Sequence, residues 1–203
     1  MEDNILIQSI VGLAGAKVFL QKLINPPLET LGDMLASEIM IFKFKRQVTL
    51  LTKAEAYLKK KGIKTKKVAL KMLVPLLEES SLEEDETLHD MWAKLLANFV
   101  REDSRVKNNL FIHILSQINI EEAEILEEMI TYSLSRISHQ ERTTWNTTYF
   151  SYLEYKADKE KLILIDNLLR LRLIHLPYGQ KSSMPSLEVT ELGYSFYEAC
   201  QTP

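Results

Sequence analysis

The chain has 203 residues, of which 46% are apolar and 26% charged, and its formal net charge at pH 7 is −3. This is the composition of an ordinary globular protein of one or two domains, and the length suffices for a stable core without disulfides or metals. The one cysteine, Cys200, excludes an internal disulfide and favours a cytoplasmic location.

Residues 5–24 form an apolar stretch that is about long enough to cross a bilayer. Two lysines, Lys17 and Lys22, interrupt it, and a lysine near the centre of a spanning helix costs about 2.5–3.5 kcal/mol. Glu2 and Asp3 stand where a signal peptide carries positive charges. We therefore predict no integral membrane insertion. The stretch is interpreted as a helix that packs on the protein's own core or on a partner, with membrane contact as the alternative.

The next pattern predicts one long helix. Asn25 can cap it, a proline suits its first turn, and apolar residues recur at helical spacing as far as about Lys61. Gly62 then supplies the left-handed conformation that commonly ends a helix. This long helix is the main element of a predicted multi-helix domain over residues 1–117.

Three shorter helices are predicted to complete this domain. The first covers residues 64–80, and residues 81–84, with the sequence SLEE, match a capping box that would open the second. The second presents an apolar stripe, from which we predict a structural core of Trp92, Leu95, Leu96 and Phe99. Apolar residues at every fourth position from Val106 to Ile118 predict the third.

Residues 118–203 predict a winged-helix-like domain. The sequence NIEE at residues 119–122 is typical of a helix cap, and a second helix is expected from Asp158. A short strand that stops at Pro177, a turn-rich tip, a second strand and a final helix from Thr190 follow. The fold class predicted for the whole chain is therefore mainly α, with a small β-hairpin in the C-terminal domain.

Between Phe42 and Lys71 the chain carries eleven basic residues and one acid. Arg46, Lys53 and Lys60 recur every seven residues and share one face of the long helix. We expect all three heads to reach solvent, because the opposite face is apolar. The residues predicted as contacts for an anionic partner are Lys43, Arg46, Lys53, Lys60, Lys64, Lys66 and Lys67.

A purely structural explanation of these charges stays open. Cations at the end of the long helix complement its dipole, and residues 72–103 carry a net charge of −7 that could neutralise an adjacent helix. Lys64, Lys66 and Lys67 resist this explanation, because we expect them at the start of a helix, where the dipole disfavours cations. The structural explanation is favoured for the run as a whole, and an acidic partner surface is the alternative.

The sequence shows no catalytic motif. It has no glycine-rich phosphate loop, no nucleophile elbow and no zinc-protease helix, and its four histidines are far apart. His89, beside Asp90, is interpreted as a solvated side chain on an exposed acidic helix. We therefore predict a protein that is not an enzyme and that has no cofactor and no metal site.

The predicted winged-helix-like domain raises the question of DNA binding, because such modules often place a helix in a groove. The helix over residues 158–172 is nearly balanced in charge, and the turn-rich tip offers only Lys181. The basic flanks that anchor phosphates are therefore thin. Protein contact or dimerisation is the favoured use of this domain.

Three segments follow one another in a recognisable order: LGDMLASEIMIFKFKRQ, VALKMLVPLLEESSLEEDE leading into MWAKLLANF, and IDNLLRLRLIHL. In this order they resemble the abortive infection alpha family, bacterial proteins of unknown molecular function associated with phage resistance, over roughly residues 15–200. The chain departs from related winged helices at Arg172, where many carry glycine. We therefore expect the turn from helix to strand to be made differently.

The resemblance implies a role in phage defence but brings no catalytic residues. We predict a non-enzymatic interaction protein that docks a protein partner or a second copy of itself, as in a homodimer. The alternative is a nucleic-acid-binding winged-helix regulator that uses Arg46, Lys53 and Lys60. A steep loss of affinity with rising salt would indicate the second.

Overall fold

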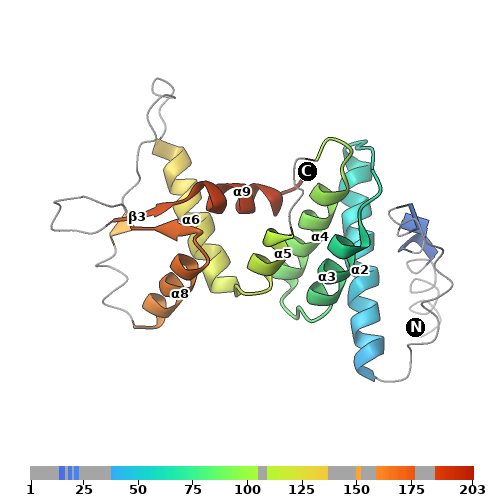
Figure 1. Cartoon of the computed structure of the whole chain (residues 1–203), viewed down its shortest axis with the longest axis horizontal. Coiled ribbons are helices and arrows are strands. Elements are labelled where there is room, and N and C mark those ends of the chain that lie inside the picture. The colour runs from blue at the N-terminus through green and yellow to red at the C-terminus, as the bar shows by residue number, and fades with distance from the viewer. Residues whose placement is uncertain are drawn as a thin grey trace, which may run out of the picture. The chain divides into compact units, whose positions relative to one another are not determined.

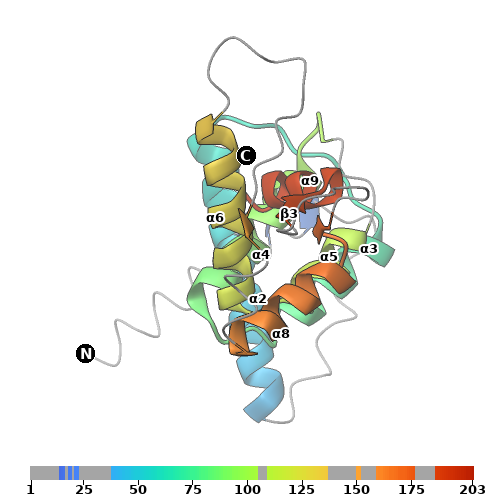
Figure 2. The same ribbon diagram turned by 90° about the vertical axis from the view of Figure 1, so that its left-hand side faces the viewer.

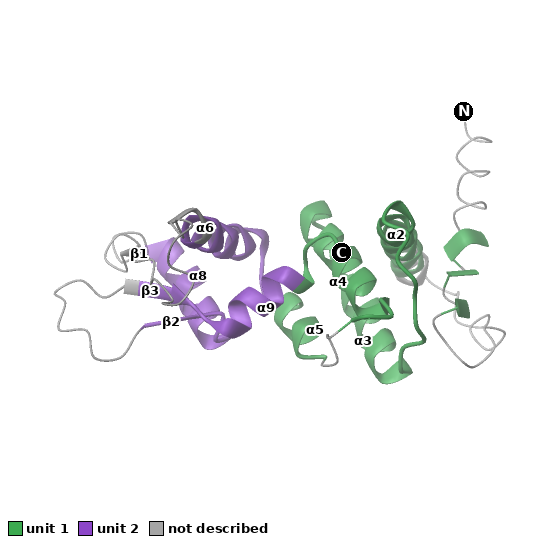
Figure 3. Cartoon of the chain, turned by 90° about the horizontal axis from the view of Figure 1, so that it is seen from above, with its two compact units in different colours: residues 1–116, 199–203 green, residues 117–198 purple. Residues whose placement is uncertain are grey.

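A computed structural model of the chain describes residues 14–16, 18–19, 21–22, 38–104, 109–136, 150–151, 159–176 and 186–203. Over these residues the protein is mainly helical and carries a small antiparallel sheet (Figure 1), in agreement with the mainly α fold class. The chain divides into two compact units, coloured separately in Figure 3. Unit 1 comprises residues 1–116 and 199–203, and unit 2 comprises residues 117–198.

The helices of unit 1 are α2 (Glu38–Lys60), α3 (Leu70–Ser80), α4 (Glu86–Val100) and α5 (Leu110–Leu115). α4 packs against both α2 and α3, and α3 also contacts α5. Arg46 of α2 contacts Glu86 at the start of α4, and Tyr57 contacts Asp90 one turn further along. α2 and α4 therefore run in the same direction, side by side in Figure 3.

The core of unit 1 forms between α2, α3 and α4. α4 buries the four residues predicted as core: Trp92, Leu95, Leu96 and Phe99. The buried apolar residues of α2 and α3 are Leu50, Leu51, Ala54, Leu58, Leu73 and Leu76. These residues recur every three or four positions, so each helix turns one apolar face inward.

α2 ends as the sequence predicts. Gly62 has φ +63°, its N–H donates to the Lys59 carbonyl at 3.1 Å, and the N–H of Ile63 donates to the Leu58 carbonyl at 2.9 Å. This double closure is a Schellman motif, which needs a left-handed residue that glycine supplies without strain. The predicted cap at Asn25 lies outside the described residues.

The helix predicted over residues 64–80 begins later than expected, at Leu70. Ahead of it Thr65 pairs antiparallel with Arg101, and the N–H of Lys66 donates to the Val100 carbonyl at 2.8 Å. The prediction of a helical start near residue 64 is wrong because the backbone finds its hydrogen bonds at the end of α4 instead of in a further helical turn.

The start of α4 also differs from the prediction, because the expected capping box does not form. Asp85 caps the helix instead and accepts hydrogen bonds from the N–H groups of Thr87 at 2.8 Å and Leu88 at 2.9 Å. Ser81 belongs to the end of α3, where its hydroxyl donates to the Glu78 carbonyl at 2.6 Å. Aspartate caps a helix as well as serine does, so the local sequence offered two starts of equal quality.

The third predicted helix is shorter than its apolar pattern. α5 ends at Leu115, and Ile118 lies beyond it, although it is buried. The chain turns there because Asn119 opens the next helix. Asn119 Oδ1 accepts from the N–H of Glu122 at 2.8 Å, and Glu122 Oε2 accepts from the N–H of Asn119 at 2.9 Å. This reciprocal pair confirms the cap predicted at residues 119–122.

Unit 2 contains α6 (Ile120–Arg136), β1 (Phe150–Ser151), α8 (Lys159–Arg170), β2 (Ile174–His175), β3 (Ser186–Val189) and most of α9 (Glu191–Ala199). β3 is the central strand and pairs antiparallel with β1 on one side and β2 on the other. α6 contacts both α8 and β3, and Figure 2 shows α6 and α8 inclined to each other. Thr190 begins α9 as predicted, with its hydroxyl accepting from the N–H of Gly193 at 3.0 Å.

The end of the chain belongs to unit 1, although the predicted second domain extended to residue 203. The buried amide of Asn98 on α4 donates to the carbonyls of Ala199 at 2.9 Å and Gln201 at 2.8 Å. These hydrogen bonds hold the last residues on the helical unit. The division after residue 116 lies beside the predicted boundary at residue 117.

Several predicted features lie outside the described residues: the loop after α6, the helix start at Asp158 and the turn-rich tip before β3. Of the apolar N-terminal stretch, residues 14–16, 18–19 and 21–22 are described and helical. Within the described parts of the chain, no helix combines the length and apolar character needed to span a bilayer.

The turn from α8 to β2 is made by a left-handed residue, Arg172, with φ 60°. Its N–H donates to the Leu169 carbonyl at 2.9 Å, and the N–H of Leu173 donates to the Leu168 carbonyl at 3.0 Å. This is the same double closure as at Gly62. The expectation that the turn is made differently from a glycine-containing one is therefore wrong, because arginine adopts the conformation that glycine prefers.

We expect Arg172→Gly to stabilise the protein by about 1 kcal/mol, because the left-handed conformation costs a residue with a Cβ roughly 1–2 kcal/mol. The Arg172 side chain is exposed, so little packing is lost. The matched control is Gly62→Ala, which should lose about 1 kcal/mol at the equivalent position of α2. Denaturant unfolding measures both, and a destabilised Arg172→Gly variant would contradict the assignment.

We expect Trp92→Ala to destabilise the protein by about 3–5 kcal/mol, because the side chain is fully buried in the core of unit 1. Trp92 is 1% exposed, whereas Val74 of α3 is 44% exposed. Val74→Ala is therefore the control and should change the free energy of unfolding by at most about 0.5 kcal/mol. Equal, small effects of both substitutions in urea unfolding would show that the stripe on α4 is not core.

Candidate anion-binding surface

The basic residues predicted to share one face of α2 do not share one environment. Arg46 Nη1 and Lys53 Nζ both reach the carboxylate of Glu86 on α4, Lys53 at 3.1 Å. The Arg46 side chain is only 13% exposed and that of Lys53 30%, whereas Lys60 is exposed. The expectation that all three heads reach solvent is therefore wrong for Arg46, which is part of the interface between α2 and α4.

Glu86 is the shared partner of these two cations. Hydrogen bonds from Arg46, and after them those from Lys53, lower the pKa of its carboxyl to about 2. The carboxylate is 69% exposed, so solvent screens part of the attraction. The pairing still uses both cations within the molecule.

A second polar group continues the same interface. Tyr57 donates to Asp90 Oδ1 at 2.5 Å, and Lys94 pairs with Asp90 Oδ2 at 2.9 Å. Burial and this hydrogen bond raise the pKa of Tyr57 to about 12. Burial acts to raise the pKa of Asp90, but the hydrogen bonds from Tyr57 and Lys94 outweigh it and hold that pKa below its usual value. The two acids of α4 are thus engaged with residues of α2 and of α4 itself.

Nitrogen atoms without partners lie within this interface. Nε and Nη2 of Arg46, both ring nitrogens of His89 and Nε1 of Trp92 are buried and make no hydrogen bond among the described residues. His89 is fully buried, so the expectation of a solvated ring is wrong. Burial, assisted by the charges of Arg46 and Lys53 and opposed by Glu86, lowers the pKa of His89 to about 4. The ring is therefore neutral at pH 7.

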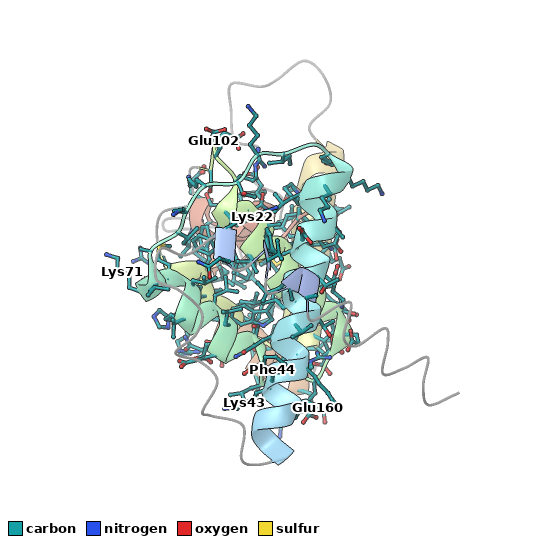
Figure 4. All side chains as sticks on the ribbon, turned by 90° about the vertical axis from the view of Figure 1, so that its right-hand side faces the viewer. Lys22, Lys43, Phe44, Lys71, Glu102 and Glu160 are labelled. Atoms are coloured by element: carbon teal, nitrogen blue, oxygen red, sulfur yellow. The ribbon has the colours of Figure 1, made fainter. Side chains whose placement is uncertain are left out.

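The remaining cations of the basic run lie at the end of α2, in the connection that follows and at the start of α3. Four of them, here called the lysine edge, are exposed and make no ion pair among the described residues: Lys60, Lys61, Lys64 and Lys71. Figure 4 shows the connection passing along the outside of the helices to α3, with Lys71 pointing away from them. The structure leaves the charge of these four lysines open to a partner.

The other predicted contacts are placed differently. Lys66 is half-buried, and its Nζ donates to the Ser104 carbonyl at 3.2 Å. Lys67 is exposed but is already engaged in an interaction within the protein. Lys43 lies near the other end of α2, away from Lys71 in Figure 4. The seven predicted residues therefore do not form one surface.

Sequence reasoning missed two members of the lysine edge, Lys61 and Lys71. The signal that finds them is the absence of any acidic residue between Glu55 and Glu78. α3 also begins without a side-chain cap and without an acid in its first turn, so the positive end of its dipole adds to the lysine charges.

Metal and thiol chemistry find little support in the described residues. No three His, Cys, Asp or Glu side chains gather there in a way that could hold a metal ion. Burial raises the pKa of the Cys200 thiol, which keeps it protonated and unreactive at neutral pH.

Fold and surface together define a mainly helical protein of two compact units, the first of which carries a lysine edge without ion pairs among the described residues. The family model for abortive infection alpha matches residues 41–200. The chain therefore belongs to the abortive infection alpha family, whose name points to defence against phage by abortive infection. No curated protein and no solved structure shows significant similarity to the chain.

We expect stability to fall as the pH is lowered from about 6.5 to about 4, the pKa values of His89 before and after folding. In this window the unfolded chain binds a proton that the folded protein does not, so the stability that the neutral ring provides above pH 6.5 is progressively lost. The loss should be roughly 2–3 kcal/mol.

The control is His89→Leu, which keeps an apolar side chain of similar volume and removes the titrating group. Its free energy of unfolding should vary much less over the same pH range. An unchanged pH dependence in this variant, measured by urea unfolding, would show that another group is responsible.

Proposed function

We propose that the protein acts in abortive-infection defence as a non-enzymatic interaction protein, through contacts with another protein or with a second copy of itself. Membership of the abortive infection alpha family over residues 41–200 carries the defence context. The surface of unit 2 supports protein contact as the mode of action.

We infer that unit 2 is a winged-helix module. Its supporting features are the order of elements, with α8 ahead of β2 and α9 after β3, and the strand order β1-β3-β2. In this arrangement α8 takes the position of the helix that DNA-binding winged helices place in a groove. The exposed face of α8 therefore decides between DNA and protein as the partner.

That face is poorly suited to a phosphate backbone. The exposed charged residues Lys159, Glu160, Lys161 and Asp166 are distributed around α8 and comprise two cations and two anions, so the exposed charges of the helix nearly cancel. Arg170 is held by Asn167 Oδ1, at 2.9 Å from Nε, and by Gln117 Oε1, at 3.0 Å from Nη1. A DNA-reading helix instead presents free basic residues to the phosphates.

The same face exposes an apolar side chain. Ile163, in the middle of α8, is 69% exposed among charges of both signs. An apolar centre within a mixed polar rim is the usual composition of a protein contact. This observation favours a protein partner over DNA for unit 2.

A nucleic-acid-binding regulator is the second candidate, and the lysine edge of unit 1 is the observation that favours it. Phosphate contacts by lysines lose affinity steeply as salt rises. A gel-shift series with duplex and single-stranded DNA at increasing salt distinguishes this candidate from protein docking.

The central test compares two α8 variants in a phage-sensitive bacterium that expresses the protein. We expect Ile163→Glu to abolish protection while leaving the protein folded, because the residue is exposed and a buried glutamate in a docked interface is costly. The matched control, Lys159→Gln with Lys161→Gln, removes phosphate-binding charge from the same helix and should retain protection. Plaque counts and the molar mass of the purified protein in solution give the readout.

Full protection by the Ile163→Glu variant, together with its loss in the lysine variant, would contradict the proposal and support nucleic-acid binding.

A further inference from the structure

We propose that the lysine edge and the adjoining start of α3 bind the surface of an anionic lipid bilayer. The residues are the four exposed lysines, Lys60, Lys61, Lys64 and Lys71, and two apolar side chains of α3. Leu70 and Val74 of that helix are 43% and 44% exposed. This binding is peripheral and needs no spanning helix.

Among the described residues, no side chain forms an ion pair with the lysine edge, and Glu102, whose N–H donates to the Lys64 carbonyl at 3.0 Å, is itself exposed. Both acids of α4 are engaged by other residues. Glu86 pairs with Arg46 and Lys53, and Asp90 interacts with Tyr57 and Lys94. The chain has no acid between residues 56 and 77. A concentration of like charge that the fold leaves uncompensated attracts an anionic partner from outside.

The apolar residues identify the kind of anionic partner. Leu70 and Val74 are one helical turn apart and share a face of α3, with Lys71 next to them. Apolar tips that enter the boundary between headgroups and acyl chains, flanked by lysines that reach the lipid phosphates, are typical of interfacial helices. Only the first half of α3 can serve this purpose, because Glu78 follows one turn after Val74.

A nucleic acid fits the same surface less well. The chain between residues 56 and 77 contains no arginine, and its one aromatic residue, Tyr57, is tied to Asp90. Sequence-tolerant binding of single strands relies on exposed aromatic rings and arginines. A duplex would use the lysines but would leave Leu70 and Val74 in water. An anionic bilayer uses both kinds of residue.

Flotation of the purified full-length protein with vesicles tests the proposal. We expect the protein to float with vesicles that contain phosphatidylglycerol and to stay unbound with pure phosphatidylcholine. Each lysine at an anionic surface contributes roughly fivefold to partitioning. Replacing all four lysines of the lysine edge with glutamine should therefore reduce binding several hundredfold, on the order of the fourth power of that factor.

A charge-matched control separates this site from general electrostatic attraction. The control replaces Lys43, Lys45, Lys159 and Lys161 with glutamine, which lowers the net charge by the same amount at sites outside the lysine edge. It should lose far less binding. Leu70→Ser with Val74→Ser keeps every lysine and should reduce binding about tenfold by removing the apolar contribution. Thermal unfolding of each variant verifies that it is folded.

Three results would overturn the proposal. One is an absence of wild-type binding to phosphatidylglycerol vesicles, and another is an equal loss of binding in the lysine-edge and control variants. The third is unchanged lipid binding in the Leu70→Ser and Val74→Ser variant combined with tight binding of DNA, which would assign the lysine edge to nucleic acid. The inference does not rest on the proposed function, because vesicle binding is measured on the purified protein without phage.

Discussion

The packing of α2 against α4 is the contact on which unit 1 depends. It buries apolar residues of α2 such as Leu50 and Ala54 in the core of unit 1, and it places Arg46 and Lys53 on the Glu86 carboxylate. The burial of apolar surface supplies most of the free energy. The ion pairs contribute less because Glu86 stays exposed to solvent. Their main consequence is that the Glu86 carboxylate is already occupied by Arg46 and Lys53.

That consequence connects the fold to its surface. Because Arg46 and Lys53 pair with Glu86 in the α2–α4 interface, and Asp90 is engaged by Tyr57 and Lys94, the acids of α4 are not available to the lysine edge. The connection from α2 to α3 forms backbone hydrogen bonds with the end of α4, which keeps it extended along the outside of the unit. The lysine edge thus follows from how the interface is built, and unit 2 contributes a separate, charge-balanced surface on α8.

The sequence predicted much of the fold because its signals were local. Gly62, the Asn119 cap and the apolar stripe of α4 each depend on residues within one or two turns, and all three form as expected. The errors arose where a distant partner competed with the local pattern. The segment before α3 is extended because it pairs with the end of α4, more than 30 residues away, and no local propensity shows that pairing. Arg172 occupies a turn that glycine usually makes, because the two backbone hydrogen bonds that close this turn do not involve the side chain.

The candidate surface was predictable only in part. Counting charges located the basic run but could not show which of its cations are paired, because the pairing depends on which of them face Glu86 across the interface. Those two cations are Arg46 and Lys53. His89 was misjudged for a related reason: the acidic residues around it in the sequence suggested exposure, whereas its position on α4 turns it toward α2 and the half-buried Arg46.

The central claim is that Glu86 neutralises the middle of α2 and leaves the lysine edge unpaired. An NMR titration of the Glu86 carboxyl carbon tests it directly. In the wild-type protein the pKa of Glu86 should lie well below its ordinary value of 4.5. It should rise toward that value in Lys53→Gln and stay low in the variant with all four lysines of the lysine edge replaced. An equal rise in both variants would show that the lysine edge is neutralised internally, and it would contradict the account.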